Sequence, residues 1–251
     1  MHLEIGVRTD TGRVRQNNED SFASEADISL FVVSDGMGGA EHGEVASAIA
    51  VATVAQHCRN ALADPKLPLE GAAHPGLTAA TNRLLSAIRS AHSAIYRLSA
   101  SDPALRGMGA TIVAAWVQGD TLSLAHVGDS RAYRLRHGNL EQLTSDHSLV
   151  AEQVRLGLLT SEQAAESHLQ TILTRALGHS EAVEVDAQEH QILAGDTFLL
   201  CSDGLSRMVP DPEIASAIDQ SLGLDAASDH LIELANRAGG EDNITALLFR
   251  A

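Results

Sequence analysis

The sequence predicts a mixed α/β (α+β) fold in which two antiparallel sheets pack face to face and helices cover both outer faces. Two observations lead to this prediction. Short strand candidates recur along the whole 251-residue chain, and the central ones are joined by tight turns, which is typical of antiparallel pairing. Helix candidates come in pairs between the strands. Neither a repeat nor a long linker divides the chain, so we expect a single domain over residues 1–251.

The first half begins with strand candidates at residues 3–7, 21–23 and 28–34, which are short apolar or β-branched runs. Two long helices follow. The first is expected over residues 44–61, and the second carries apolar residues every three or four positions from Leu77 to Leu98, a single stripe down one face. The stretch between these helices is rich in proline and glycine, which indicates a surface loop.

The second half opens with a meander, whose strands are expected at residues 111–117, 121–127 and 132–135. Residues 146–178 then leave this core as an excursion with two short helices, the second opened by Thr160 in a sequence with the form of a capping box. The remaining elements are two helices, which begin near Asp211 and Leu224, and strands at residues 183–188, 197–202 and 244–249.

Composition limits the possible partners and location. A formal net charge of -16 argues against nucleic acid or an anionic membrane surface, since both would be repelled. No apolar run approaches the roughly 18 residues that span a bilayer, and the N-terminus lacks a signal-peptide profile. Cys58 and Cys201 form no metal-spaced pair, so we interpret them as reduced core residues. We therefore expect a cytoplasmic protein.

Four acidic segments carry the chemistry, and three of them adjoin an apolar run. Carboxylates that converge at strand ends repel one another unless divalent cations hold them, and an arginine beside them suggests a phosphate ligand. The hard ions Mg²⁺ and Mn²⁺ prefer such oxygen ligands, and no clustered thiolate or imidazole set here would select zinc. A lone histidine such as His126 is more often a core or surface residue than a ligand. The four segments occupy residues 15–20, 35–39, 202–204 and 241–243.

Six motifs in this order resemble those of the metal-dependent type 2C serine/threonine protein phosphatases. They span nearly the whole chain, and residues 146–150 and 173–178 resemble the flap region of the bacterial branch of that family. Each motif alone is weak, because Asp-Gly is also a common turn, but the ordered set is specific. The six motifs are Arg-Gln-Asn-Asn-Glu-Asp at 15–20, Asp-Gly-Met-Gly-Gly at 35–39, Gly-Ala-Thr at 109–111, Val-Gly-Asp-Ser-Arg at 127–131, Ser-Asp-Gly-Leu at 202–205 and Glu-Asp-Asn-Ile-Thr at 241–245.

The resemblance implies a four-layer α/β/β/α sandwich with two central antiparallel sheets and two metal ions in a cleft at one end. It implies that Asp35 bridges the ions, that the Gly36 carbonyl binds one of them, and that Arg15 grips the phosphate. A water shared by the two ions would attack phosphorus directly, without a phosphoenzyme. The remaining implied ligands are Asp203 and Asp242, Glu19 and Asp20 directly or through water, and Asp129, which with Asp203 binds a third ion in bacterial members.

One position departs from the pattern of some members, which place a histidine after the Asp-Gly of the second motif. Here that residue is Met37, so the sequence identifies no general acid for the leaving alcohol, and His42 is a candidate by proximity alone. Two alternatives stay open beside a phosphoprotein phosphatase. One is a pseudophosphatase that only binds a partner, although Asp35, Asp203 and Asp242 are all present, and the other is a hydrolase of small phosphate esters.

The implied partners are phosphorylated proteins, among them a serine/threonine kinase and its substrates. We expect a monomer, with no nucleic acid or membrane partner and no fused sensor or kinase domain.

Overall fold

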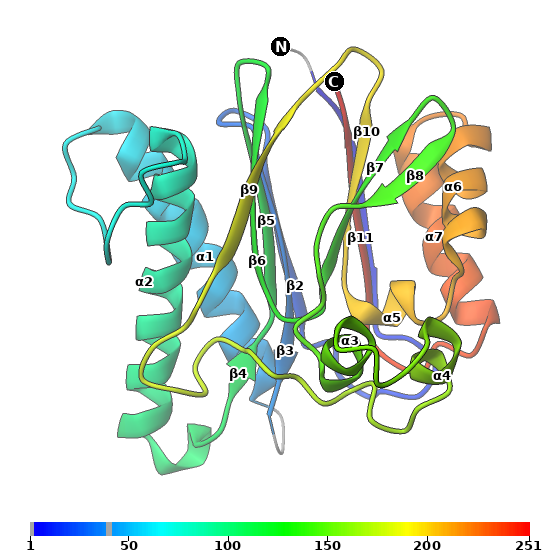
Figure 1. The fold of residues 1–251 in the computed structure, drawn as a ribbon, viewed down its shortest axis with the longest axis horizontal. Helices are drawn as coiled ribbons and strands as arrows, with labels where there is room; N and C mark the ends of the chain where they lie inside the picture. The colour runs from blue at the N-terminus through cyan, green and yellow to red at the C-terminus, as the bar shows by residue number, and fades with distance from the viewer. Residues whose placement is uncertain (1–2, 39–41) are drawn as a thin grey trace.

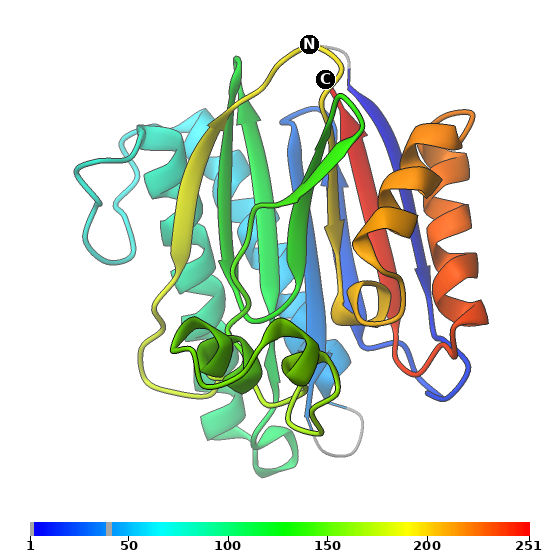
Figure 2. The same cartoon turned by 45° about the vertical axis from the view of Figure 1, so that its right-hand side comes forward.

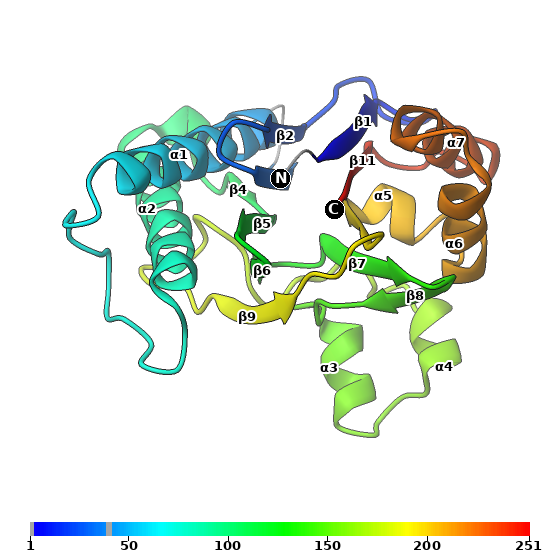
Figure 3. The same cartoon turned by 90° about the horizontal axis from the view of Figure 1, so that it is seen from above.

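The computed structural model describes residues 3–38 and 42–251, so Gly39 of the second motif lies outside the described residues. Four layers are stacked side by side: a helix pair, two sheets and a second helix pair (Figures 1 and 3). The first strand begins and the last strand ends at one end of the sandwich, where Glu4 pairs with Arg250, and the short helices of residues 146–178 lie at the other end (Figure 2). The predicted fold class is confirmed.

The first sheet contains the strands nearest the N-terminal helices, and all of its neighbours are antiparallel. Its order is β2-β3-β5-β6-β9, with the two-residue strand β4 paired to β3. The elements are β2 (Asp20–Glu25), β3 (Leu30–Met37), β4 (Gly109–Ala110), β5 (Ile112–Gln118), β6 (Thr121–Val127) and β9 (Asp186–Gln191).

The second sheet has the order β1-β11-β10-β7-β8 and is also antiparallel throughout. Its two central strands, β10 and β11, are almost entirely buried. The elements are β1 (Glu4–Asp10), β7 (Arg131–Arg136), β8 (Asn139–Gln142), β10 (Thr197–Cys201) and β11 (Ile244–Arg250).

Two helix pairs cover the outer faces of the sheets. The helix α2 begins after Thr78, whose Oγ1 accepts the Thr81 backbone N–H at 3.3 Å, as an N-cap should. No helix of the described residues is both long enough and apolar enough to cross a membrane. The helices are α1 (Gly43–Ala63), α2 (Ala79–Ser101), the 3₁₀ turn η1 (Pro103–Leu105), α3 (Leu149–Arg155), α4 (Ser161–Ala165), α5 (Asp203–Ser206), α6 (Asp211–Gln220) and α7 (Leu224–Arg237).

Several boundaries differ from the sequence predictions, and each difference has a local cause. The strand expected over residues 183–188 is β9 (Asp186–Gln191), an edge strand of polar, half-buried residues that shows no apolar pattern. The elements β4 and α5 are too short for periodicity to reveal. The capping box at Thr160 is present, with both reciprocal hydrogen bonds to Gln163.

Side chains of successive residues in the central strands enter different cores. On β3, Leu30 and Val32 pack against the α1–α2 layer, whereas Phe31 and Val33 pack between the sheets. Phe31 stacks on Phe249 of β11 with ring centroids 4.2 Å apart. Because both faces of these strands are buried, their sequences are continuous apolar runs. This packing holds the sheets in a fixed relation, which the cleft at their shared end requires.

The stack between the sheets makes the first testable prediction. Phe249→Ala should lower the free energy of unfolding by about 3–5 kcal/mol, because it removes a fully buried ring and leaves a cavity. Phe22→Ala is the matched control, because Phe22 lies on the edge strand β2 and is 37% exposed. Denaturant unfolding of both variants measures the difference, and equal losses would contradict the proposed role of the stack.

Candidate metal centre

The first sheet brings two carboxylates face to face. Asp20 begins β2 and is the direct cross-strand partner of Asp35, near the end of β3. Like charges in directly opposite positions destabilise a sheet. The Gly36 N–H donates to the Glu19 carbonyl at 3.1 Å, so the residue before Asp20 is joined to the residue after Asp35.

The second sheet contributes two more carboxylates at the same end of the sandwich. Asp203 begins α5 just after β10, and Asp242 lies just before β11, the antiparallel neighbour of β10. Figure 1 shows α5 and the end of β3 at the lower end of the two sheets. The four aspartates therefore come from segments far apart in sequence, as the strand-end argument predicted.

A cavity of about 190 Å³ lies between these segments. Apart from Asp20, the predicted site residues all line this cavity, and Thr171 and Leu173 of the flap line it as well. The lining residues predicted from sequence are Arg15, Glu19, Asp35, Gly36, Asp129, Asp203 and Asp242.

Two glycines allow the backbone to close around the cavity. A Cβ on Gly36 would lie 2.1 Å from the Gly43 carbonyl oxygen, and one on Gly43 would lie 2.6 Å from the Gly36 carbonyl carbon. The start of α1 therefore contacts the end of β3 directly. Only glycine permits this approach, which leaves Gly43 with a structural role and the Gly36 backbone at the cavity wall.

Burial, reinforced by repulsion among the carboxylates, dominates the electrostatics of the site. Burial, and then the neighbouring Asp20, Asp203, Asp129 and Asp242, raises the pKa of Asp35 well above its ordinary value. Burial raises the pKa of Asp20 to about 7, although hydrogen bonds from Thr245 and Ser202 oppose the shift. Burial and the charge of Asp203 raise the pKa of Asp129 to about 8. Without a cation, Asp20 and Asp129 retain protons near neutral pH.

The residues fit divalent cations. Asp20 Oδ1 and Asp203 Oδ1 are buried and have no hydrogen-bond partner among the described residues, and a buried carboxylate oxygen without a partner is costly. Carboxylate, carbonyl and water oxygens are the donors that Mg²⁺ and Mn²⁺ prefer. A cation bound here would relieve both the repulsion and the missing partners.

Two arginines border the cluster. Arg15 donates to Asp242 Oδ2 at 2.8 Å, and its side chain is 53% exposed, so guanidinium donors stay free for a ligand. Arg207 donates to Asp203 Oδ2 at 3.2 Å. Arg207 lies on no motif noted in the sequence and was missed. Its position four residues after Asp203 on a helical turn is the signal that could have found it.

The sequence analysis also did not identify the neutral side chains that hydrogen-bond to the acidic residues or to their backbone. Ser202 and Thr245 both donate to Asp20 Oδ2, at 2.7 and 2.6 Å. Asn243 accepts the Glu19 backbone N–H at 2.8 Å, and Thr111 Oγ1 accepts that of Asp35 at 3.0 Å. All four lie in the quoted motifs, and their hydrogen bonds hold the acidic residues in position.

The flap region adds a second cavity. A space of about 610 Å³ extends from Asp129 and Asp203 to α3 and α4, and Arg131, Arg155 and Arg207 also line it. In Figure 2 these two helices lie across the lower end of the sandwich, in front of the sheets. The flap therefore forms one wall of the space next to the carboxylates.

The chain is similar to known proteins along its whole length. The family model described as "Protein phosphatase 2C" matches residues 10–248. The serine/threonine phosphatase stp of Listeria welshimeri is 40% identical over 99% of this chain and 95% of its own length. The crystal structure of the serine/threonine phosphatase PstP/Ppp of Mycobacterium tuberculosis is 38% identical, with a TM-score of 0.87 over 100% of this chain and 99% of that one. A structure of the PstP catalytic domain in complex with two manganese ions is also 38% identical, with a TM-score of 0.83 over 99% and 97%.

The raised carboxyl pKa values predict how stability depends on pH when metal is removed. The folded protein retains protons on Asp20 and Asp129 up to about pH 7 and 8, whereas the unfolded chain loses them near pH 3.8. The folded state therefore binds more protons across this window, and the free energy of unfolding falls as pH rises. Buried histidines such as His147 have lowered pKa values and oppose this trend only below about pH 6.5.

Denaturant unfolding in chelator should thus show stability falling from about pH 6.5 to about pH 8. Asp129→Asn should flatten the slope, because it removes one of the titrating groups. Excess Mn²⁺ should stabilise the protein most at the upper end, because cations bind the deprotonated carboxylates. Stability that rises over this range in chelator would contradict the electrostatic account.

Proposed function

The chain belongs to the protein phosphatase 2C family, and from that membership we propose how its cleft hydrolyses phosphoserine and phosphothreonine in proteins. It is a metal-dependent serine/threonine protein phosphatase, as its relatives and the manganese-bound PstP structure indicate. The observation that carries the proposal is the convergence of five carboxylates on one small cleft, with Asp20 paired to one of them and an arginine in the lining. Such a site suits a phosphate ester bound beside two divalent cations.

The ligand roles are those that the resemblance to the family implies. Asp35, near the end of β3, would hold both of two Mn²⁺ or Mg²⁺ ions. The Gly36 carbonyl would hold one ion, Asp203 and Asp242 would hold the other, and Glu19 and Asp20 would act directly or through water. Asp129, with Asp203, would hold a third ion. When bound, the ions supply a water of lowered pKa and offset the charge that develops on the phosphoryl oxygens.

Arg15 is proposed to bind the substrate phosphate. Its planar guanidinium matches two phosphate oxygens, and its ion pair with Asp242 aims it at the cleft. The Met37 side chain has no acidic proton, so it cannot protonate the leaving alcohol. His42, at the N-terminal cap of α1, stays a candidate for this step.

We further propose that residues 1–251 form one catalytic domain with residues 146–178 as its flap. The enzyme would act as a cytoplasmic monomer and reverse the action of a serine/threonine kinase. Support for these points comes from the charge and the motifs of the chain.

The first test of function is metal dependence. Purified protein should hydrolyse a phosphothreonine peptide with Mn²⁺ or Mg²⁺ and lose this activity in chelator, because the ions would supply the water of lowered pKa that attacks phosphorus. Readdition of Mn²⁺ should restore the rate, which controls for irreversible unfolding. Activity that survives full metal removal would exclude the mechanism.

The second test separates ligand and substrate roles. Asp35→Asn and Asp203→Asn should each lower kcat by about a hundredfold or more, comparable to the loss of a major electrostatic stabiliser. Arg15→Ala should chiefly raise KM, because the substitution removes a contact to the phosphate but no proposed metal ligand. Steady-state kinetics give the split, and calorimetry should show weakened metal binding in the aspartate variants alone. Unchanged KM and kcat in Arg15→Ala would remove Arg15 from the site.

A further inference from the structure

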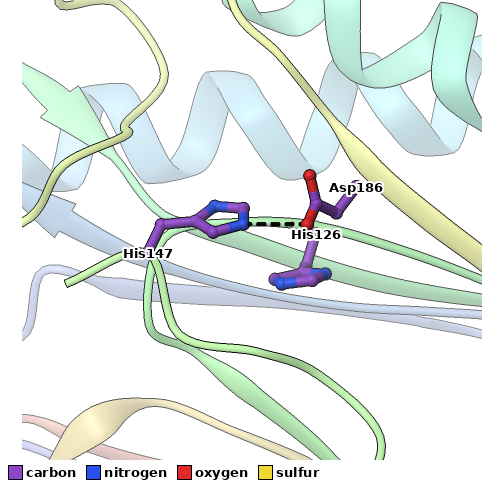
Figure 4. Close-up of side chains that lie close together, drawn as sticks. All are labelled: His126, His147 and Asp186. Carbon is purple, nitrogen blue, oxygen red and sulfur yellow. Dashed lines mark ion pairs between the residues drawn. The ribbon is translucent and has the colours of Figure 1, made fainter. Parts of the chain in front are cut away.

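Three side chains outside the cleft, two of them buried, form a cluster at the base of the flap. His126 lies near the end of β6, His147 lies just before α3, and Asp186 begins β9. The two imidazoles are only 3% and 4% exposed. Figure 4 shows the His147 ring pointing at the Asp186 carboxylate, with Nε2 and Oδ2 3.3 Å apart, and the His126 ring beside it.

The spacing of these three groups could suit a metal ion, but their hydrogen bonds indicate otherwise. The Gly128 backbone N–H, which can only donate, points at His147 Nδ1 at 3.2 Å, so the proton of the neutral ring is on Nε2 and faces Asp186. His126 Nε2 lies 2.9 Å from the Ser145 carbonyl and must donate to it. The other Asp186 oxygen accepts from Arg175 at 2.6 Å. Arg175 also lies 3.4 Å from His147 Nε2, but a neutral ring that accepts at Nδ1 cannot accept at Nε2 as well, so this longer approach is not a hydrogen bond. Both Nε2 atoms are therefore protonated and cannot bind a cation.

His147 instead holds Gly128, the residue before Asp129, through two hydrogen bonds, which we call the clasp. Its backbone N–H donates to the Gly128 carbonyl at 3.0 Å while its Nδ1 accepts the Gly128 N–H. On the other side, a Cβ on Gly128 would lie 2.6 Å from Thr111 Cβ, and Gly128 has a φ of +104°. Gly128 is thus held between Thr111 and His147, and Asp129 is the next residue.

The same clasp ties the two ends of the flap together. The His147 carbonyl accepts the Thr174 N–H at 2.8 Å, and Arg175, next to Thr174, joins Asp186. His147 lines neither cavity of the site, so it touches no reacting group.

We propose that His147, with its tautomer set by Asp186, is a positioning residue that fixes the Gly128 backbone and so aims the Asp129 carboxylate at the cleft. The functional part rests on the proposed role of Asp129 as a ligand of the third ion. The clasp itself rests on the hydrogen bonds alone.

Two substitutions separate the two bonds of the ring. In His147→Asn the side-chain oxygen takes the place of Nδ1 and still accepts the Gly128 N–H, but the side chain no longer reaches Asp186. In His147→Gln the amide takes the place of Nε2 and still donates to Asp186, but the buried Gly128 N–H loses its acceptor. His168→Gln, at an exposed flap position, is the control.

Two readouts are needed: hydrogen exchange of the Gly128 amide in metal-free protein, and Mn²⁺ stoichiometry by calorimetry. His147→Gln should speed Gly128 exchange by roughly fivefold to tenfold and lose the same Mn²⁺ binding event as Asp129→Ala, whereas His147→Asn and His168→Gln should keep both. Equal losses in the Asn and Gln variants, or unchanged Gly128 exchange in His147→Gln, would overturn the clasp.

Two further outcomes keep the parts of the proposal distinct. If Asp129→Ala binds as many ions as the unaltered protein, the proposed ligand role of Asp129 fails, and with it the functional part of the inference. If His147→Gln does not fold, Asp186→Ala replaces it, because the Asp186 side chain is 43% exposed. Asp186→Ala should free the ring to change tautomer and speed Gly128 exchange, and unchanged exchange would overturn the tautomer argument.

Discussion

Mutual repulsion among the carboxylates at one end of the sandwich is the constraint on which the site depends. Asp20 and Asp35 are paired across two strands, and Asp203 and Asp242 arrive from the neighbouring sheet. A fold that brings these charges together loses stability unless protons or cations neutralise them. Divalent ions therefore have two connected effects in this protein: they make the cleft reactive, and they stabilise the arrangement that binds them.

The sandwich can hold such a cleft because its two sheets are locked together elsewhere. Phe31, Phe198 and Phe249 stack between them, and the Gly36–Gly43 contact fixes the first helix against the end of β3. Ser202 and Thr245 then hold Asp20 from the second sheet. The ligands are thus positioned by rigid elements and by neutral hydrogen-bond donors, which add no further charge to the cluster.

The flap is built in a different way. Few of its residues are buried, and Leu156 and Leu158 are each about two-thirds exposed. The polar network of His147, Arg175 and Asp186 around Gly128 ties it to the body, together with the Arg131–Asp146 ion pair and the backbone bridge between Ala110 and Leu177. Because that network ends beside Asp129, the same hydrogen bonds hold both the base of the flap and one proposed metal ligand.

The sequence by itself determined the element types, the sandwich class and the candidate ligands. Apolar runs record burial on both faces of a strand, and the order of the acidic motifs along the chain is specific enough to imply the cleft. Only the tertiary structure decided the pairing of Asp20 with Asp35, the hydrogen bonds from Ser202 and Thr245 to Asp20, and the clasp of His147 on Gly128. These contacts depend on strand register and on packing between distant segments, and no local pattern records either. His126 is an example. In the sequence it is a lone histidine, for which a core or surface position is the simplest interpretation, because its contacts come from residues 19 or more positions away.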